Sequence, residues 1–284
     1  MDPRTALVLG RVSNLPTVWS NVLAGTLLAG GRMEDGIPVL PLALASLLYL
    51  GGMYLNDAFD RDFDAKEVPT RPIPSGRATV RAVFAAGFAM LGGGILLSAT
   101  AGGAVFPVAL ALAAGILAYD IHHKGNRLSP LLMGLCRALV YALAGFAAAA
   151  AAAPSPLLAA GAVALFCHVA GLTYAARQEN RSGFRLAWPL GVLAAAPVLV
   201  LAAAGEKTES WPFLILFLAW MGYGLTRLTV RRRCDVRAAV GAMIAAISLL
   251  DAVWIAGVAG PLPALAGVAA FALTVAAQRF VPGT

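Results

Sequence analysis

Long apolar segments alternate with short polar connections along the whole chain of 284 residues. A helix that crosses a membrane needs roughly 20 consecutive apolar residues, and these segments have about that length. The pattern predicts ten spans, at residues 6–31, 37–57, 79–100, 103–121, 128–152, 155–177, 184–204, 211–228, 236–259 and 262–280. The first segment is too long for a cleaved secretory signal and is expected to remain as a span. The chain is therefore predicted to be an all-α polytopic membrane protein.

The polar connections differ in charge, and the difference alternates along the chain. Basic connections follow the second, fourth, sixth and eighth spans, with the sequences DRDFDAKEVPTRPIPSGRATVR, HHKGNR, RQENRSGFR and RLTVRRRCDVR. Because basic residues favour the cytoplasmic side, we expect the N-terminus and all four basic connections to face the cytoplasm from the inner membrane. The net charge of +7 then reflects topology and contact with anionic membrane lipid, and no nucleic-acid partner is expected.

Composition supports the same class of protein. Hydrophobic residues make up 60% of the chain and charged residues only 12%, against roughly 25% charged residues in a soluble domain. A soluble globular enzyme is therefore excluded. The three cysteines, Cys136, Cys167 and Cys234, have no spacing typical of a metal or disulfide site, and we interpret them as small packing residues.

Acidic residues gather at one place in this apolar chain, in the stretch NDAFDRDFD at residues 56–64. At 100° per residue, Asp57, Asp60 and Asp64 lie within about 60° of one another on a helical face, whereas Asp62 points away. Like charges on one face are unfavourable unless a cation binds among them. Carboxylate oxygens that leave room for water and phosphate ligands are typical of Mg²⁺ sites, so these three aspartates are predicted metal ligands.

Basic residues follow the acidic stretch in the cytoplasmic connections, at Arg71, Arg77 and Lys124. Acids that hold a metal, with bases nearby, match the needs of a Mg²⁺–diphosphate, because the metal bridges acid to phosphate and the bases neutralise the remaining oxygens. The apolar bundle would supply a pocket for the tail that carries the diphosphate.

The same residues carry a resemblance to a known family. NDAFDRDFD fits N-D-x-x-D-x-x-x-D, a signature of the UbiA superfamily of intramembrane prenyltransferases; TRPIPSG at 70–76 resembles the R-P-L-x-S-G continuation, and YDIHHK resembles the Y-x-x-x-x-K element. The stretches MGLCR (133–137) and SNLPTVWSNVLAG (13–25) resemble the EboC-like branch of the superfamily. The resemblance covers nearly the whole chain.

The resemblance implies a fold, a reaction and residue roles. The fold is a bundle of nine helices, built from two four-helix halves and a further helix. The reaction is Mg²⁺-dependent ionisation of a prenyl diphosphate and transfer of the prenyl group to a small acceptor, often aromatic. Asp57, Asp60 and Asp64 would bind the metal and Asn56 would orient them. The diphosphate would contact the matched positions Arg71, Tyr119 and Lys124.

The chain departs from the family at its second motif, which is normally acid-rich. Here the sequence is ARQENRSG, in which Glu179 is the sole acid and a candidate metal ligand. Three interpretations stay open. The second metal binds weakly, or Arg177 and Arg181 contact the diphosphate in its place, or chemistry has been lost and the site only binds.

The two motifs also define an internal repeat. GMYLNDAFD (52–60) and GLTYAARQE (171–179) each close a long apolar helix on the predicted cytoplasmic side. We therefore expect one integral membrane unit over residues 1–284, with half-repeats of about 1–125 and 126–230 followed by helices within 236–280, and a site between the halves.

Four polar residues inside the predicted spans need partners. Asp251 lies near the middle of the ninth span, where a charged residue costs roughly 2.5–3.5 kcal/mol; it either lines the cavity or pairs with an intramembrane arginine such as Arg137. Asn14 and Asn21 are seven residues apart on one helical face and are expected to line the polar end of the cavity, with Asn21 a candidate diphosphate ligand. His168 is more typical of an interhelical hydrogen-bonding residue than of a base.

Two alternatives to the transferase remain at this point. An intramembrane terpene cyclase would keep the ionisation and need no acceptor. A non-catalytic carrier of prenyl lipids would bind the diphosphate without cleaving it, and the weakened second motif favours it.

Overall fold

The computed structural model describes residues 1–148, 155–177, 188–204, 207–229 and 235–283. Every regular element among them is helical. The α-helices are α1 (Pro3–Leu9), α2 (Leu15–Leu28), α3 (Val39–Phe59), α4 (Arg61–Glu67), α5 (Val80–Ser98), α6 (Val105–His122), α7 (Ser129–Ala148), α8 (Pro156–Ala176), α9 (Trp188–Ala204), α10 (Trp211–Thr229), α11 (Val236–Ala259) and α12 (Pro261–Ala277). Short 3₁₀ turns lie at Val12–Asn14, Met33–Asp35 and Thr208–Ser210.

Seven helices in the described part of the chain are long and apolar enough to cross a membrane, and the shorter apolar helices are 188–203 and 261–277. The protein is therefore a multi-pass membrane protein, as the hydropathy pattern predicted. Nine of the ten predicted segments each correspond to a single helix.

The prediction of one continuous first span at 6–31 is wrong. The helix breaks after α1 at Arg11, which has the left-handed backbone angles φ 40° and ψ 48°, and α2 begins only at Leu15. A non-glycine residue in this region is unfavourable and needs compensating contacts. The Arg11 side chain supplies them, because it reaches across to the end of α3.

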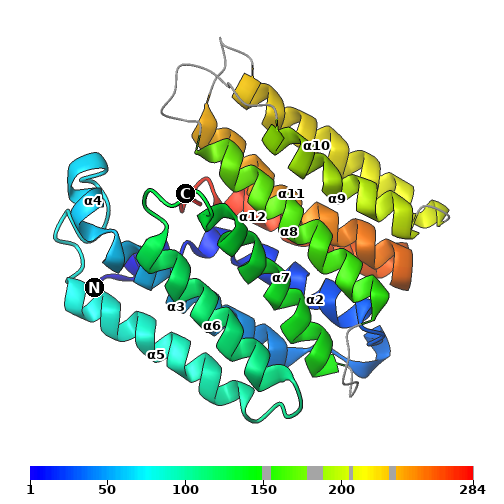
Figure 1. Cartoon of the computed structure of the whole chain (residues 1–284), viewed down its shortest axis with the longest axis horizontal. Helices are drawn as coiled ribbons and strands as arrows, with labels where there is room; N and C mark the ends of the chain where they lie inside the picture. Colours follow the sequence, from blue (N-terminus) through cyan, green and yellow to red (C-terminus); the bar gives the residue numbers. More distant parts are fainter. Residues whose placement is uncertain (149–154, 178–187, 205–206, 230–234, 284) are drawn as a thin grey trace.

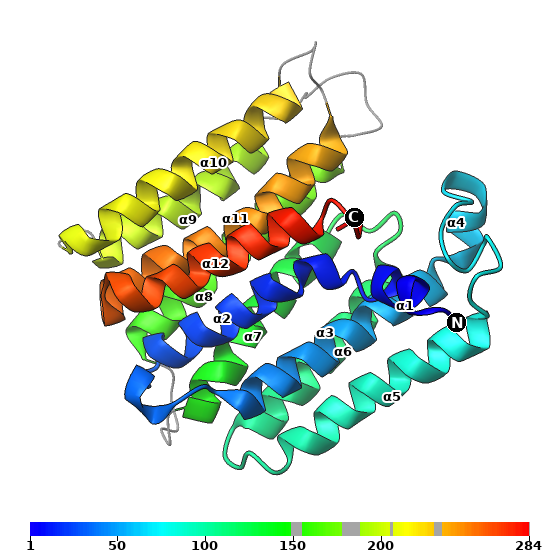
Figure 2. The same ribbon diagram turned by 180° about the vertical axis from the view of Figure 1, so that it is seen from behind.

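The bundle is arranged around α11, whose residues are almost all buried from Ala239 to Gly257. Figure 1 shows α9 and α10 on one side of the bundle and α5 on the other, with α2, α7, α11 and α12 between them. Figure 2 shows the same order from behind. Its buried polar residues Ser248 and Asp251 hydrogen-bond to α2 and α7, which fits the central place of α11, because polar residues inside a span face the interior of the bundle.

Small residues let neighbouring helices approach closely. A Cβ on Gly25 of α2 would lie 2.7 Å from the Tyr141 carbonyl oxygen of α7, and a Cβ on Gly51 of α3 would lie 2.9 Å from the Gly87 carbonyl oxygen of α5. Close backbone approach through glycine is a common way of packing helices in lipid. The glycine contacts fix α3 against α5 and so fix the end of α3, which carries the acidic residues.

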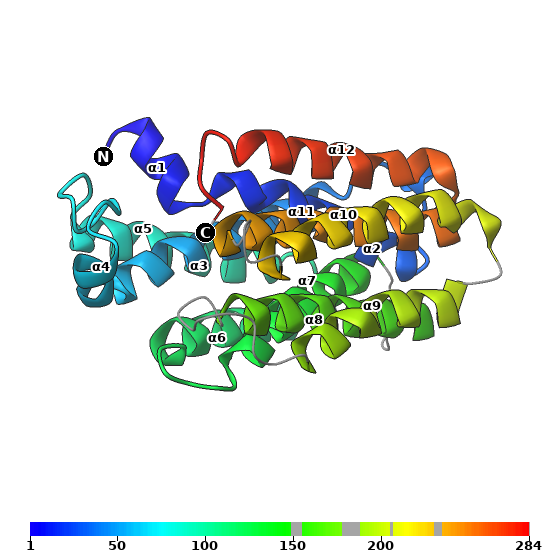
Figure 3. The same ribbon diagram turned by 90° about the horizontal axis from the view of Figure 1, so that it is seen from above.

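The end of α3, the short helix α4 and the N-terminal helix α1 lie at the same end of the bundle (Figure 3). The polar motifs of the sequence are therefore brought to one end of an otherwise apolar molecule.

Candidate functional site

The three predicted metal ligands are buried together where α3 ends and α4 begins. Asp57, Asp60 and Asp64 are 5%, 6% and 2% exposed. By contrast, the side chain of Asp62 is 85% exposed, as the helical spacing predicted. A buried carboxylate is unfavourable unless it is paired, so the partners of these three aspartates define the site.

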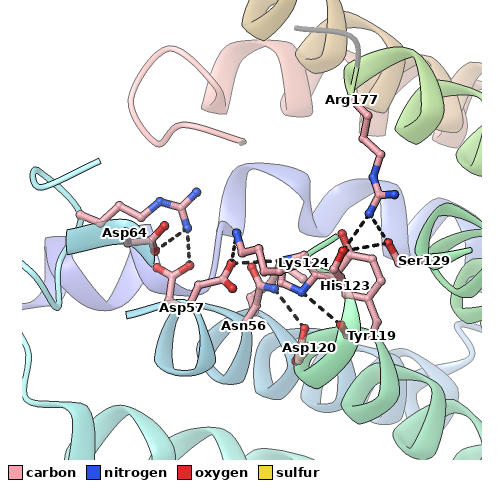
Figure 4. Close-up of polar contacts among 12 residues, drawn as sticks. Asn56, Asp57, Asp64, Tyr119, Asp120, His123, Lys124, Ser129 and Arg177 are labelled. Carbon is pink, nitrogen blue, oxygen red and sulfur yellow. Dashed lines mark hydrogen bonds and ion pairs between the residues drawn. The ribbon is translucent and has the colours of Figure 1, made fainter. Parts of the chain in front are cut away.

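Two arginines converge on Asp57. Its Oδ1 accepts hydrogen bonds from Arg11 Nη2 at 3.0 Å and from Arg71 Nη1 at 2.8 Å. Arg71 also lies 3.3 Å from Asp64 Oδ2, but that contact lacks hydrogen-bond geometry and leaves the buried oxygen without a donor. Figure 4 shows Asp57 and Asp64 facing the same guanidinium group.

A second pair of bases contacts Asp60. Lys124 Nζ lies 3.0 Å and His123 Nε2 lies 3.3 Å from Asp60 Oδ2. Lys124 also lies over the ring of Phe63, 3.7 Å from its centroid. The structure thus places the acidic motif at residues 56–64 next to the end of α6. From the sequence, only the family resemblance connected these two segments.

The pKa values of two site carboxyls shift in opposite directions. Burial alone would raise the pKa of Asp60, but the hydrogen bond and charge of His123 and the ion pair with Lys124 outweigh it, so this pKa is lowered. Burial raises the pKa of Asp64, and the charges of Asp60 and Asp57 add to the shift although Arg71 opposes it. The two pKa shifts differ in direction because Asp60 has two basic partners, whereas Asp64 shares its one basic partner, Arg71, with Asp57.

Asn56 joins the acids to a residue that the sequence did not single out. Its Nδ2 donates to Asp120 Oδ1 at 3.1 Å, and its Oδ1 accepts from Arg11 Nη2 at 3.0 Å. Asp120 is buried, and its Oδ2 has no hydrogen-bond partner. Neither Arg11 nor Asp120 was predicted as a site residue, although each carried a signal: Arg11 was a lone charge in an apolar segment, and Asp120 lies inside YDIHHK.

A pocket of about 380 Å³ continues inward from this cluster. Its polar end includes Asn56, Asp60, Arg71, Tyr119, Asp120 and Lys124, and apolar side chains such as Val18, Leu112, Val140 and Leu172 line the remainder. Tyr119 stacks on His123 with ring centroids 4.8 Å apart. A polar, charged mouth on an apolar interior can hold an amphiphile with an anionic head.

The connection that carries Lys124 is held by Arg177 at the end of α8. Arg177 donates to the carbonyl oxygens of Asn126 at 2.6 Å and His123 at 3.0 Å, and also contacts Ser129 Oγ (Figure 4). Arg177 therefore positions the α6–α7 connection. The neighbouring predicted residues Glu179 and Arg181 lie outside the described residues.

The structure does not bring Asn21 to the acid cluster. Its Nδ2 donates to both carboxylate oxygens of Asp251, at 3.0 and 2.8 Å, and its Oδ1 accepts from Arg137 Nη1 at 2.9 Å. Tyr141 donates a further hydrogen bond to Asp251 at 2.6 Å. This network joins α2, α7 and α11. The partners of Asp251 are Asn21 and Tyr141, and Arg137 is connected to Asp251 only through Asn21.

The remaining polar candidates have structural partners. Asn14 lines the pocket, but it donates to the Gly283 carbonyl oxygen at 2.7 Å and accepts from Gln278 at 3.1 Å. His168 is fully buried and lies 2.9 Å from the Met243 carbonyl oxygen through Nε2. The expectation of an interhelical hydrogen bond for His168 is therefore confirmed.

The residues present fit Mg²⁺ bound together with a diphosphate. No three acidic, histidine or cysteine side chains in the described part of the chain are arranged to hold a metal ion by themselves. Mg²⁺ seldom needs such a cage, because one or two carboxylates suffice when phosphates and water supply its other ligands. The bare oxygen of Asp64 and the carboxylates of Asp57 and Asp60 provide hard oxygen donors of this kind.

Comparison with protein families matches residues 18–187 to the UbiA prenyltransferase family. The chain belongs to this family. A relative from Halobacterium salinarum, named digeranylgeranylglyceryl phosphate synthase, is 31% identical over 236 residues, which cover 76% of this chain and 80% of that protein. The UbiA resemblance seen in the sequence is thereby confirmed, while the narrower EboC-like assignment stays a prediction.

Other relatives share the same name over shorter regions. The protein from Methanopyrus kandleri is 38% identical over 94 residues, or 32% of this chain and 34% of that protein. The protein from Methanothrix thermoacetophila matches over 46% of its length. The chain thus spans less than half of the length of these two relatives in alignment.

Solved structures show the same fold. A UbiA homologue from Archaeoglobus fulgidus superposes with a TM-score of 0.64 at 14% identity, covering 89% of this chain and 99% of that one. A UbiA homologue from Archaeoglobus fulgidus bound to GPP and Mg²⁺ gives a TM-score of 0.51 at 15% identity, covering 96% of this chain and 98% of that one. At these identities the likeness concerns the fold alone.

Proposed function

We propose that this UbiA family member is a Mg²⁺-dependent intramembrane prenyltransferase that ionises a prenyl diphosphate and transfers the prenyl group to a small lipophilic acceptor. The observation that carries the proposal is the convergence of Asp57, Asp60 and Asp64 with Arg71 and Lys124 at the polar mouth of an apolar pocket. The names of the relatives and the GPP and Mg²⁺ bound by the Archaeoglobus homologue support it.

The charge balance of the site supports binding of a metal and an anion together. Asp57 and Asp64 face Arg71, and Asp57 also faces Arg11. Asp60 faces Lys124 and His123, so the three acids meet two arginines, a lysine and a histidine. A diphosphate alone would compete with the aspartates for the bases, and a metal alone would compete with the bases for the aspartates. When the metal and the diphosphate bind together, the aspartates exchange their basic partners for the metal and the bases exchange the aspartates for diphosphate oxygens, so each ion pair is replaced by another of comparable strength.

The side chains would then divide the work of ionisation. Mg²⁺, when bound through Asp57, Asp60 and Asp64, supplies charge that stabilises the departing diphosphate. Arg71 and Lys124 would hold diphosphate oxygens, with Tyr119 at the same end of the pocket. Glu179 and Arg181 are proposed as further ligands of metal and diphosphate. Asn56 would keep the carboxylates oriented through its bonds to Arg11 and Asp120.

The apolar part of the pocket would protect the reaction from water. The bond between the prenyl carbon and the diphosphate oxygen breaks, the electron pair leaves with the diphosphate, and the acceptor attacks the allylic carbon and loses one proton. Leu112, Val140 and Leu172 line the wall beyond the polar end, where excluded water cannot capture the cation. The names of the relatives make a glyceryl phosphate one candidate acceptor, beside an aromatic one.

We further propose the arrangement in the membrane. Nine spans and a tenth at the C-terminus would form two pseudo-repeated four-helix halves, about 1–125 and 126–230, with helices 236–280 completing one unit. The N-terminus and the acidic cluster would face the cytoplasm. The basic character of the connections after α3, α6, α8 and α10 supports this orientation.

The test is incubation of the purified protein with a panel of prenyl diphosphates and Mg²⁺, followed through pyrophosphate release. The transferase predicts Mg²⁺-dependent release that rises when an acceptor is added. Release with a product that contains only prenyl carbons would indicate a terpene cyclase instead. Binding without release would indicate a prenyl-lipid carrier, the alternative that the missing acids of the 178–181 motif favour.

A further inference from the structure

Asp120 is a buried carboxylate in the lining of the pocket, and one of its oxygens has no task in the ionisation described above. It lies in the last turn of α6 and is 5% exposed. Its Oδ1 accepts the hydrogen bond of Asn56 at 3.1 Å (Figure 4), whereas its buried Oδ2 has no partner among the described residues. A donor from a bound ligand would therefore stabilise this side chain.

The orientation of Asn56 does not by itself account for a carboxylate at position 120. An amide there could accept the same hydrogen bond through its single oxygen and would bury no charge. A carboxylate inside a span is costly without an ion pair, and no base in the described part of the chain forms one with Asp120. Arg11 donates to Asn56 and Asp57 instead. The second oxygen of Asp120 therefore has no structural explanation in these contacts.

The carboxylate of Asp120 is held in one place by the packing of α3 against α6. A Cβ on Gly52, one turn before Asn56 in α3, would lie 2.8 Å from Cγ2 of Ile116, which is one turn before Asp120 in α6. This close approach fixes the distance between the two helices. The hydrogen bond from Asn56 then fixes the rotation of the carboxylate. A group held in this way is ready to react with a ligand in the pocket.

The other proton acceptors at the polar end of the pocket are already engaged. Among the described residues that line the pocket, the acids are Asp60 and Asp120. Asp60 faces Lys124 and His123 and is a proposed metal ligand. His123 faces Asp60 with Nε2 and lies 3.1 Å from the Tyr119 carbonyl oxygen with Nδ1, so both of its nitrogens have partners. Asp120 is thus the pocket carboxylate that has an oxygen left to accept a proton.

We propose that Asp120 is the general base of the transfer step and takes the proton that the acceptor loses. The proposal rests on the proposed transferase function. The bond between the prenyl carbon and the diphosphate oxygen breaks, and the diphosphate keeps the electron pair. An acceptor atom forms a bond to the allylic carbon, and its proton moves to the Asp120 carboxylate. The proton passes to water when the products leave, which restores the carboxylate. The acceptor then lies beside α6, one turn along that helix from Lys124.

A nucleophile that has no proton to lose separates a general base from a positioning residue. The full-length protein in nanodiscs receives a prenyl diphosphate and Mg²⁺ with either azide or a hydroxyl probe, for which an alkylphenol and a monoalkylglyceryl phosphate are used. The products are quantified by mass spectrometry. In Asp120→Asn, transfer to the hydroxyl probe should fall by about 10²-fold or more, as expected for loss of a general base. Formation of the prenyl azide should be unchanged, because the new amide can still accept from Asn56.

The ratio of the two products carries the test, because both come from the same active protein and the ratio does not depend on how much of a variant is folded. Asn56→Ala removes the positioning hydrogen bond and should lower both products together. Asp62→Asn, at an acid whose side chain is 85% exposed, is the control and should change neither. Equal loss of both products in Asp120→Asn would show that Asp120 acts only through Asn56, which would overturn the proposal.

Failure of this proposal and failure of the transferase function give different results. If Asp120→Asn transfers to a hydroxyl probe as fast as the wild type, the diphosphate or water takes the proton, so the role of Asp120 fails and the transferase stands. If the wild type releases pyrophosphate but transfers to neither hydroxyl probe, transfer and its base both fail and the ionisation stands. If the wild type releases no pyrophosphate with any probe, the transferase function fails and the role of Asp120 fails with it.

Discussion

Replacing Asp57 by asparagine should abolish turnover while the protein stays folded. The substitution keeps the shape of the side chain and removes the charge to which Arg11 and Arg71 bind at 3.0 and 2.8 Å. It also removes a predicted metal ligand. Stability and activity should therefore respond very differently.

The size of the stability loss in the Asp57→Asn variant depends on the contacts that Arg11 and Arg71 retain. Leaving a buried charge without a partner costs roughly 3–5 kcal/mol. Here Arg11 keeps Asn56 Oδ1 at 3.0 Å and Arg71 keeps Asp64 at 3.3 Å, and their side chains are 18% and 25% exposed. The new amide oxygen can still accept. We therefore expect the Asp57→Asn variant to lose only about 1–2 kcal/mol.

The assay pairs thermal unfolding in detergent without Mg²⁺ with pyrophosphate release at saturating Mg²⁺. We expect release to fall by at least about 10²-fold, because a charge that stabilises the transition state is lost. Asp62→Asn is the matched control, since it removes an acid from the same motif whose side chain is 85% exposed, and it should change neither quantity. Comparable activity in both variants would refute the proposed role of Asp57, and failure of the Asp57 variant to fold would refute the stability estimate.

Three further changes test other parts of the site. Asp64→Asn should raise the melting temperature without Mg²⁺ near neutral pH, because burial raises the pKa of Asp64 and makes its charged form unfavourable. The protonated Asp64 stabilises the wild type in acid, and this contribution is lost as pH rises through the raised pKa. The melting temperatures of wild type and variant, measured from about pH 4 to 7, should therefore converge at the acid end. Lys124→Met keeps an apolar stem over the Phe63 ring but removes the charge 3.0 Å from Asp60, and should raise the KM of the prenyl diphosphate about tenfold in steady-state kinetics. Asp251→Ala leaves the donors of Asn21 and Tyr141 unpaired. It should cost about 1–3 kcal/mol for each donor in thermal unfolding, with the KM of the prenyl diphosphate unchanged; a changed KM at unchanged stability would restore Asn21 as a diphosphate ligand.

The helical organisation could be predicted from the sequence because lipid imposes a simple rule on it. Each apolar segment must satisfy its backbone hydrogen bonds within one helix, so the length of a segment gives its bounds. The segment at 236–259 became α11 with those same bounds. The spacing likewise predicted that Asp57, Asp60 and Asp64 lie together and that Asp62 points away. They do not share the face of one helix, however, because α3 ends at Phe59 and α4 begins at Arg61.

Contacts between distant segments could not be predicted in this way. The helix break at Arg11 depends on acceptors at Asn56 and Asp57, some 45 residues along the chain. The partner of Asp251 is Asn21 from α2, although the hydropathy pattern gave no reason to prefer it over Arg137. Such pairings follow from the way helices pack, which periodicity within one helix does not contain.

Asp120 illustrates a further limit of reading motifs. Comparison with the family pattern used Tyr119 and Lys124, the two ends of YDIHHK, and treated the residues between them as variable. In the fold, Asp120 lies one residue from Tyr119 on the inner side of α6 and receives the hydrogen bond of Asn56. A lone acid near the end of an apolar helix was the available signal.

Mg²⁺-dependent binding of a prenyl diphosphate tests the central claim most directly. Equilibrium binding of an uncleavable prenyl thiolodiphosphate to the full-length protein would be measured with Mg²⁺ and with EDTA, in the wild type and in the Asp57→Asn and Asp62→Asn variants. We predict tight binding only with Mg²⁺, its loss in the Asp57 variant and its retention in the Asp62 variant. Binding that is equally tight in EDTA, or unaffected by loss of the Asp57 charge, would contradict the assignment of this acidic cluster as the metal–diphosphate site.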